Sequence, residues 1–372
     1  MRILIIDTYY EDFLDKFYQT NKYLKRSTYD DQLKALIDSS FGTSDYYSYY
    51  LNNHKAFKAS DLIVNCKYLQ NAWAKENNIK VFRINLNYKI FKIPIFGNFL
   101  NKLPNLADIA FEQIKKIKPD IIYIQNLSFF PKEVLLNIKN YSKLVVGQIA
   151  SPLPPISFLE PYDLILTSFP HFVGQIKKLG INSEYFRIGF DSRVLKRLKH
   201  QKKDINFSFV GSISKYHNKA MPILEYLIKK NNLKIFGQGV KNLPIFSKIR
   251  RCHSGEKWGL EMYSTLQRSL ISLNRHISTS KNYANNMRLF EATGMGSLLL
   301  TDYKDNLNEM FVIDKEVITY KSKEEASDKA SYYLRNQDQL KKISLAGQKR
   351  TLKDHTYEKR MGELNIILKK YL

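Results

Sequence analysis

An arginine and a glutamate three residues apart, Arg288 and Glu291, mark the stretch of this sequence best suited to chemistry. That spacing places both side chains on one face of a helix. Asn285 or Asn286 can cap the first turn, and Gly294 suits a left-handed residue that ends the helix. Free amides and an arginine at a helix start can hold a diphosphate, and a carboxylate one turn further can accept from a ribose. The stretch therefore predicts a nucleotide site.

Ordinary structural interpretations compete with this one. Helix–glycine–strand units occur throughout α/β proteins, and an Arg–Glu pair at this spacing is usually solvated. Gly211 and Ser212 follow a predicted strand, where a glycine lets backbone amides approach a phosphate. A plain tight turn would have the same sequence pattern. Asn274 and His276 follow another strand and could contact phosphate or sugar, unless they belong to a solvated loop.

Candidates for a general base lie in the first half of the chain. Asp7, Asp12 and His171 are the ionisable groups best placed there to take a proton from an acceptor hydroxyl. Asp7 could instead cap a helix, and His171 could simply begin one. No group of His, Asp and Glu has convincing metal spacing, so we expect neither a metal nor a cofactor.

Length and composition predict a globular protein with two domains. The chain has 372 residues, of which 44% are hydrophobic and 25% charged. No apolar run approaches the roughly 20 residues that span a bilayer, and residues 1–7 suit a buried strand better than a signal peptide. Cys66 and Cys252 support no disulfide framework and fit a reducing compartment, so a cytoplasmic location is expected.

The net charge of +24 points to an anionic partner. Nucleic acid is the weakest candidate, because no zinc-finger spacing, aromatic RNA-binding strand or basic heptad is present. Nucleotide sugars and phospholipid surfaces are both anionic. We therefore expect a nucleotide-sugar partner, no nucleic acid, and peripheral contact with an anionic membrane at its inner face as an extension.

Strands alternate with helices along most of the chain, which predicts parallel, doubly wound sheets. Ligands of such sheets lie beyond the carboxyl ends of the strands. In the first half we expect strands at 1–7, 79–83, 120–125, 143–147 and 163–167, helices at 9–26, 30–39, 59–77, 106–118, 131–140 and 170–179, and an irregular loop at 85–104. In the second half we expect strands at 205–210, 233–236, 270–273, 297–301 and 316–320, and helices at 220–230, 256–268, 323–335, 337–352 and 357–372.

The second half resembles the glycosyltransferases of the spore-maturation CgeB-like group, which have the GT-B fold. The matching residues are Asn286-Met287-Arg288-Leu289-Phe290-Glu291-Ala292 with Gly294, Leu299-Leu300-Thr301-Asp302, Glu316, Tyr320-Lys321-Ser322, Ala346-Gly347, and His355-Thr356-Tyr357 with Arg360. Looser matches in the rest of the chain include Gln148-Ile149-Ala150, Thr167-Ser168-Phe169-Pro170-His171 and Phe209-Val210-Gly211-Ser212-Ile213.

The resemblance implies two Rossmann-like domains that face a central cleft: an acceptor-side domain at 1–190, a nucleotide-sugar domain at 191–355, and a C-terminal helix at 356–372 that crosses back onto the first domain. It implies metal-independent transfer of a sugar to a glycan, lipid-linked or protein acceptor, in cell-surface glycan synthesis or protein glycosylation. Related retaining enzymes carry a Glu-x7-Glu motif. Glu291 matches its second Glu, but Tyr283 stands at the first, so retaining stereochemistry is not carried over.

Two alternatives stay open at this point. A nucleotide-sugar epimerase or hydrolase would keep the fold and use no separate acceptor. A catalytically inactive adaptor would keep the fold and lose turnover, and Tyr283 in place of an acidic residue keeps this second alternative in play.

Overall fold

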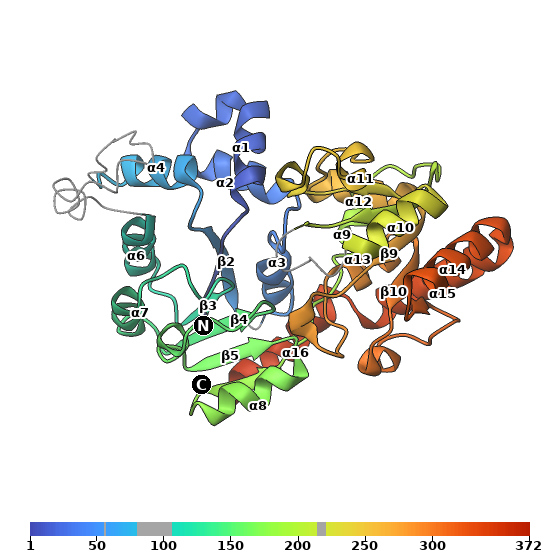
Figure 1. Ribbon diagram of the computed structural model, residues 1–372. Coiled ribbons are helices and arrows are strands. Elements are labelled where there is room, and N and C mark those ends of the chain that lie inside the picture. Colours follow the sequence, from blue (N-terminus) through green and yellow to red (C-terminus); the bar gives the residue numbers. More distant parts are fainter. Residues whose placement is uncertain (56, 80–105, 214–220) are drawn as a thin grey trace.

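Two separate parallel sheets organise the chain in the computed structural model, which describes residues 1–55, 57–79, 106–213 and 221–372 (Figure 1). The first is six-stranded, in the order β2-β1-β3-β4-β5-β6. Its strands are β1 (Arg2–Asp7), β2 (Lys58–Ile63), β3 (Ile121–Ile124), β4 (Leu144–Ile149), β5 (Leu164–Thr167) and β6 (Asn182–Tyr185). The second is five-stranded, in the order β11-β10-β9-β7-β8. Its strands are β7 (Ile205–Val210), β8 (Lys234–Phe236), β9 (Ser269–Asn274), β10 (Leu298–Asp302) and β11 (Ile318–Tyr320).

Helices cover both faces of each sheet, which is why the strands read as continuous apolar runs. The helices that follow the strands of the first sheet are α1 (Glu11–Thr20), α2 (Tyr29–Asp38), α3 (Tyr46–Asn53), α4 (Lys67–Glu76), α6 (Leu106–Ile117), α7 (Lys132–Lys139) and α8 (Pro170–Lys178). The later helices are α9 (Arg193–Arg197), α10 (Met221–Asn231), α11 (Lys248–Arg251), α12 (Gly259–Arg268), α13 (Arg288–Gly294), α14 (Lys323–Arg335), α15 (Gln337–Asp354) and α16 (Tyr357–Lys370).

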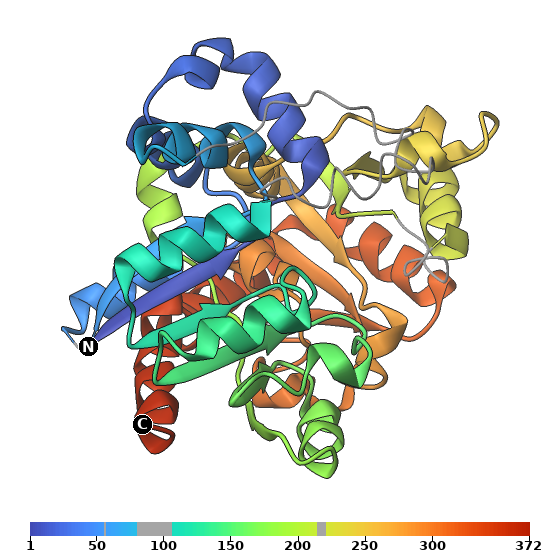
Figure 2. The same ribbon diagram turned by 90° about the vertical axis from the view of Figure 1, so that its left-hand side faces the viewer.

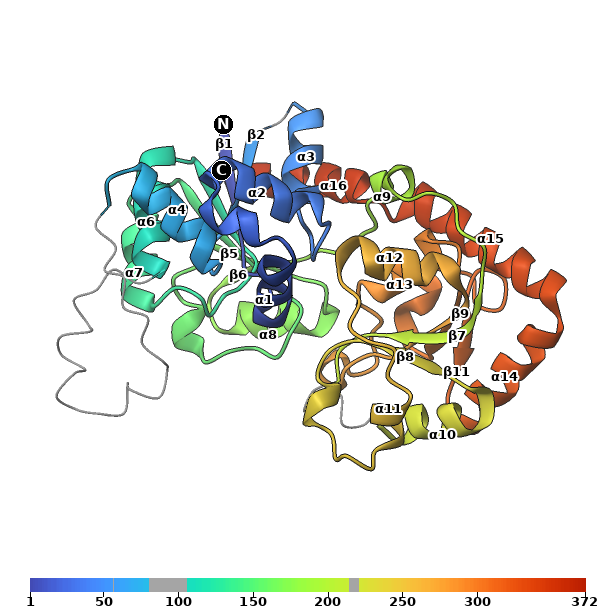
Figure 3. The same ribbon diagram turned by 90° about the horizontal axis from the view of Figure 1, so that it is seen from above.

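The last helix, α16, returns to the first sheet (Figures 1 and 3). Its Tyr357, Met361 and Leu364 are buried in the same apolar cluster as Ile3 and Ile5 of β1. The Thr356 side chain caps the helix by accepting from the amide of Lys359. The predicted α/β fold, with two Rossmann-like sheets and a C-terminal helix that crosses back, is therefore confirmed.

The predicted helix at 59–77 is wrong in its first part. Residues Lys58–Ile63 form β2, which pairs in parallel with β1, and the helix α4 begins only at Lys67. Leu62 and Ile63 fit helical spacing. They also form a short apolar run, which can pair with the edge of β1 that would otherwise be open. The sequence reading also missed α3, α9, α11 and β6, all short elements that carry little periodicity.

Some expectations lie outside the described residues. The predicted strand at 79–83 and loop at 85–104 fall almost entirely within residues 80–105. The domain bounds at 190 and 355 stay predictions. The last strand of the first sheet ends at Tyr185 and the first strand of the second begins at Ile205.

Buried charge fixes the segment between the sheets. Arg193 binds the Asp45 carboxylate with both terminal nitrogens, at 2.6 and 3.1 Å, and also contacts Asp191 at 2.8 Å. The Tyr50 hydroxyl donates to the Asp191 carboxylate at 2.8 Å. Because Asp45 and Tyr50 belong to the first part of the chain, these bonds hold the start of the second part against it.

Gly259 provides a second close contact between the parts, and its replacement by alanine should destabilise the protein. Its φ is +49°, and a Cβ would lie 2.0 Å from the Ser39 carbonyl oxygen. The neighbouring amide of Leu260 donates to that same oxygen at 3.1 Å. We expect Gly259→Ala to cost about 1–3 kcal/mol of unfolding free energy, measured by urea denaturation. Gly174→Ala is the control: no atom lies within 4 Å of its Cβ position in α8, so a neutral or stabilising effect is expected there. Equal stability of both variants would contradict the contact.

Candidate functional site

The Arg288–Glu291 pair is buried between α12 and α13. Arg288 Nη1 lies 2.8 Å from Glu291 Oε2, and the two side chains are only 16% and 6% exposed. From α12, the Tyr263 hydroxyl donates to Glu291 Oε1 at 3.4 Å, and Met262 Sδ accepts from Arg288 Nη1 at 3.1 Å. The interpretation as a solvated surface pair is therefore wrong. Arg288 Nε is buried and has no hydrogen-bond partner among the described residues.

The predicted asparagine cap of α13 is wrong, because Met287 precedes the helix with helical backbone angles and no side chain caps it. Asn286 instead donates to Asn274 Oδ1 at 2.8 Å and to the Arg275 carbonyl at 3.3 Å. Its own Oδ1 is buried without a partner in the described structure. The Asn285 side chain donates to Ser168 Oγ of the first domain at 3.3 Å. Both asparagines thus face the carboxyl edges of the sheets.

Gly294 does not have the predicted left-handed conformation. It is the last residue of α13, and the positive φ of +71° belongs to Gly296. A Cβ on Gly294 would lie 2.6 Å from the Phe190 ring. Glycine is needed there for close packing between α13 and the Phe190 ring.

His276 and Asp302 form a buried pair at the carboxyl ends of β9 and β10. The two atoms His276 Nδ1 and Asp302 Oδ1 lie 2.7 Å apart, and the His276 amide donates to the same oxygen at 3.0 Å. Burial raises the pKa of Asp302, but the bond and charge of His276, with Lys304 nearby, outweigh it and leave the pKa lowered. The ionised carboxylate assigns the Nδ1 proton to His276.

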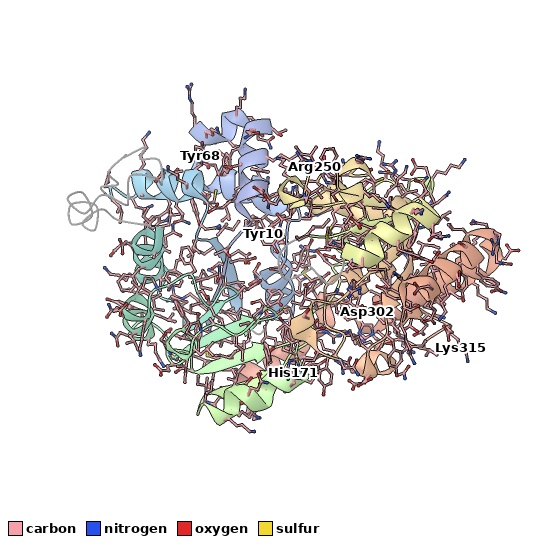
Figure 4. The ribbon with its side chains drawn as sticks, in the orientation of Figure 1. Tyr10, Tyr68, His171, Arg250, Asp302 and Lys315 are labelled. Atoms are coloured by element: carbon pink, nitrogen blue, oxygen red, sulfur yellow. The ribbon has the colours of Figure 1, made fainter. Side chains whose placement is uncertain are left out.

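The other ring nitrogen of His276 is free to serve a ligand. The His276 side chain is 0% exposed, and its Nε2 has no hydrogen-bond partner among the described residues. Asn286 Oδ1 and Arg288 Nε are similarly unpaired. A buried polar atom without a partner costs free energy unless something binds it. Three such atoms around the start of α13 suit a bound polar molecule: Arg288 Nε can donate to an anion, whereas Asn286 Oδ1 and, with the proton on Nδ1, His276 Nε2 can accept from ligand hydroxyl or amine groups. Figure 4 labels Asp302, the hydrogen-bond partner of His276.

The Gly211 amide is not free to bind a phosphate, as the sequence suggests it to be. The Gly211 amide donates to the Phe236 carbonyl at 2.9 Å, and the Ile213 amide donates to the Gln238 carbonyl at 2.9 Å. Ser212 Oγ accepts from the Gln238 side chain at 3.0 Å. The residues after β7 are thus hydrogen-bonded to the residues after β8. The Gly211 and Ile213 amides therefore have a structural role and are not available to a phosphate.

Asp7 ends β1 at the carboxyl edge of the first sheet. It accepts from the Thr8 amide at 2.7 Å and from the Thr43 hydroxyl at 3.3 Å, and that hydroxyl lies 3.0 Å from Gln125 Oε1. Burial, partly offset by these hydrogen bonds, raises the pKa of Asp7 to about 6. No side chain caps α1, which excludes the capping role for Asp7. A carboxylate with this pKa suits proton transfer near neutral pH.

His171 and Asp12 have different surroundings. His171 lies in the first turn of α8 and stacks on Tyr283 of the second domain, with ring centroids 5.4 Å apart and an interplanar angle of 16°. Burial and the charge of Lys281 lower its pKa, and both ring nitrogens of His171 are buried without a hydrogen-bond partner among the described residues. Asp12 is exposed in the first turn of α1. Among the described residues it forms no hydrogen bond or ion pair with Asp7 or His171.

The charges of two carboxylates, Asp7 in the first domain and Glu291 in the second, both act on Tyr10. Partial burial raises the pKa of Tyr10, although the residue is 53% exposed, and the negative charges of Asp7 and then Glu291 raise it further. Tyr10 lies between the two domains in Figure 4 and packs against Trp258, with ring centroids 5.9 Å apart. The carboxyl edge of the first sheet and the start of α13 therefore act on one tyrosine at the domain boundary.

The described residues contain no group of three or more His, Cys, Asp or Glu side chains that could hold a metal ion. Within the same residues, every helix is too short or too polar to cross a bilayer.

Comparisons with known proteins show what the second part of the chain and the whole fold are similar to. Residues 192–365 match the profile of a family described as glycosyl transferase-like. The fold is similar to Alr3699/HepE of Anabaena, solved with UDP and glucose, with a TM-score of 0.61, 12% identity and 100% of both chains covered. It is also similar to a glycosyltransferase of Rickettsia africae (TM-score 0.57, 15% identity, 100% and 98% covered) and to a sucrose-phosphate synthase of Thermosynechococcus elongatus (0.58, 7%, 100% and 99%). Comparison of the sequence with curated proteins gives no match.

Residues 192–365 therefore match a glycosyl transferase-like family, and the whole chain has the GT-B fold. The predicted class of enzyme, a glycosyltransferase, is confirmed.

Sequence reasoning missed Asp302 and Thr43 as partners within the site. Asp302 ends β10, Asn274 ends the neighbouring strand β9, and His276 lies two residues beyond it. Residues that end adjacent parallel strands meet at one edge, so this pairing could have been inferred. Thr43 follows α2 in a short loop and has no such signal.

Proposed function

We propose that the protein transfers a sugar from a nucleotide-sugar, bound at the start of α13, to an acceptor hydroxyl held at the carboxyl edge of the first sheet. The observation that carries the proposal is the buried Arg288–Glu291 pair beside the unpaired atoms of His276, Asn286 and Arg288. Arg288 would bind the diphosphate and stabilise it as it leaves, because the Leu289, Phe290 and Glu291 amides that the sequence suggests for this role already donate to the Asn286 and Met287 carbonyls. His276 Nε2 would accept from a hydroxyl of the sugar. Glu291 would accept from the ribose hydroxyls.

UDP-sugars are the donors to test first. Alr3699/HepE, which shares the fold, was solved with UDP and glucose and with UDP-glucose. The donor base and sugar can be identified by a thermal-shift screen with UDP-, GDP-, CMP- and TDP-sugars, because a ligand that binds the folded state raises the melting temperature.

The finer assignments belong to the same proposal. Membership of the CgeB-like group, metal independence and an acceptor that is a glycan, lipid or protein follow from the resemblance of residues 286–360. Tyr283, which replaces an acidic residue of the Glu-x7-Glu motif, stacks on His171. Tyr283 thus supports a different role at that position, contact with the first domain.

The alternatives differ in products. An epimerase or hydrolase would convert the donor without an acceptor, and an inactive adaptor would bind nucleotide and convert nothing. Chromatography of reactions with donor alone, and with donor plus a panel of acceptors, separates the three. Transfer that depends on an acceptor supports our proposal.

Glu291→Gln tests the donor site directly. A neutral amide keeps the shape but loses the charge that strengthens hydrogen bonds to a vicinal diol. We expect UDP affinity to fall about ten- to a hundredfold, the equivalent of roughly 1.5–3 kcal/mol, measured by titration calorimetry. Glu316→Gln is the control, since Glu316 forms a partly buried ion pair with Arg350 at 3.0 Å in the same domain. A folded Glu291→Gln protein that binds UDP like the wild type would place the donor elsewhere.

A further inference from the structure

One short segment of the second domain exposes large apolar side chains among cations. Residues 240–251, here called the tip, lie between β8 and α12 and include α11. Ile245 and Phe246 within it are 72% and 80% exposed. The tip contains the cations Lys241, Lys248, Arg250 and Arg251 and no acidic residue.

The tip is a built structure with a fixed inside and outside. Val240 and Ile249 are buried in the core of the second domain, and Leu243 packs against that core. Arg250 Nη1 donates to the Leu243 carbonyl at 3.0 Å, and the Ser247 amide donates to the Pro244 carbonyl at 2.9 Å. The tip therefore buries three of its apolar residues and holds the other two, Ile245 and Phe246, outside.

A second basic and aromatic segment lies on the same side of the molecule. Residues Lys22–Arg26 after α1 contain three cations and Tyr23, which is 69% exposed. Lys25 Nζ lies 4.8 Å from the centroid of the Tyr68 ring. Figure 4 labels Tyr68 and Arg250 on the upper side of the two domains, and Figures 1 and 2 place the α1 region (blue) and the α11 region (gold) uppermost.

We propose that the tip docks this face of the protein on an anionic lipid bilayer, with Ile245 and Phe246 in the interfacial layer and Lys241, Lys248 and Arg251 on lipid phosphates. Apolar side chains ringed by Lys and Arg bind membrane surfaces by combining apolar burial with attraction to anionic lipid. Charge complementarity selects this partner, because the tip and residues 22–26 are basic and contain no acid. Two apolar side chains are also too few for a stable protein interface, which buries about 800 Å² on each side.

Vesicle flotation tests the proposal with the full-length protein. We expect it to float with phosphatidylcholine vesicles containing about one-third phosphatidylglycerol, not with pure phosphatidylcholine, and to be released by high salt, because screening weakens surface attraction. The double variant Ile245→Ser/Phe246→Ser should lower the partition coefficient about tenfold or more through lost apolar burial. The triple variant Lys241→Glu/Lys248→Glu/Arg251→Glu should lower it about a hundredfold.

Matched controls separate docking from general surface effects. Ile366 of α16 is also 72% exposed, so Ile366→Ser should bind vesicles like the wild type. The triple variant Lys341→Glu/Lys342→Glu/Lys349→Glu makes the same charge change on exposed positions of α15 and should weaken binding far less than the triple variant of the tip.

Three outcomes would overturn the proposal: no flotation of the wild type with anionic vesicles, equal flotation of the Ile245→Ser/Phe246→Ser variant, or equal losses in the two triple variants. Self-association that is seen by analytical ultracentrifugation without vesicles and is abolished by Ile245→Ser/Phe246→Ser would make the tip a protein interface instead. UDP titration of the same samples keeps these results separate from the donor-site proposal, because the tip contains none of its residues.

Discussion

Replacing Asp7 by asparagine is expected to lower kcat about 10²- to 10⁴-fold, the usual contribution of a general base. Asp7 ends β1, accepts from the Thr8 amide and the Thr43 hydroxyl, and has a pKa raised to about 6 by burial. Asparagine can still accept from the Thr8 amide with Oδ1 and can donate to the Thr43 hydroxyl with Nδ2, but it cannot take a proton from an acceptor hydroxyl. UDP affinity should stay unchanged, because the donor groups lie in the second domain.

The pH profile identifies the base. A base acts only when ionised, so kcat/KM of the wild type should decrease as the pH falls below about 6, the pKa of Asp7. This acid limb should be absent from the residual activity of Asp7→Asn. Asp61→Asn is the matched control: Asp61 is another acid of the first sheet whose pKa burial raises to about 7, but it lies within β2 and accepts from Ser48. If Asp7→Asn retains full turnover and His171→Asn loses it, His171 is the base.

The same substitution should stabilise the fold. The pKa of Asp7 is higher in the folded protein than its ordinary value of 3.8. The folded state therefore holds the proton more tightly, and stability falls as the pH rises from about 4 to about 6. Above pH 6 the buried charge costs about 1–3 kcal/mol. Asp7→Asn should be more stable than the wild type by about that amount at pH 8 and nearly equal to it at pH 4, as measured by urea denaturation. A less stable variant at pH 8 would show that the ionised carboxylate is well solvated.

Much of the fold could be predicted from the sequence because its strands are buried on both faces. Runs such as 1–7, 205–210 and 297–301 are apolar, short and bounded by polar or glycine residues, which is typical of central parallel strands. The error at 59–77 arises where two periods overlap. Leu62 and Ile63 satisfy helical spacing, but pairing with β1 decides their conformation, and a tertiary contact of this kind leaves no local signal.

The site was predictable in its residue types and less so in its geometry. Arg288 and Glu291 were paired by helical spacing alone, and the structure pairs them at 2.8 Å. Their burial could not be read from that spacing, because it depends on Tyr263 and Met262 of α12. Asn286 illustrates the opposite case. An asparagine at this position suggests a helix cap. However, Met287 is the residue that precedes α13, and the Asn286 side chain donates to Asn274 at the end of β9 instead.

Arg288→Ala should have two separate effects, one on stability and one on the donor. The substitution leaves the Glu291 carboxylate buried with only the Tyr263 hydroxyl at 3.4 Å. Removal of one partner of a buried ion pair lowers the unfolding free energy by about 3–5 kcal/mol, and we expect a loss of that size here. Loss of a charge-assisted contact to phosphate should also weaken UDP binding about ten- to a hundredfold. Arg350→Ala is the control for stability, because Arg350 is one-third exposed and its pair with Glu316 is partly solvated, so a small loss is expected there.

The double variant Arg288→Ala/Glu291→Gln distinguishes the two effects. It removes the stranded carboxylate together with the arginine, so much of the lost stability should return, as it does when both members of a buried ion pair are neutralised. UDP affinity should not return, because neither the phosphate contact nor the charged ribose acceptor is restored. Urea denaturation and UDP calorimetry on the two single variants and the double variant give both coupling energies. If UDP affinity recovers along with stability, Arg288 and Glu291 only hold α13 against α12, and the diphosphate binds elsewhere.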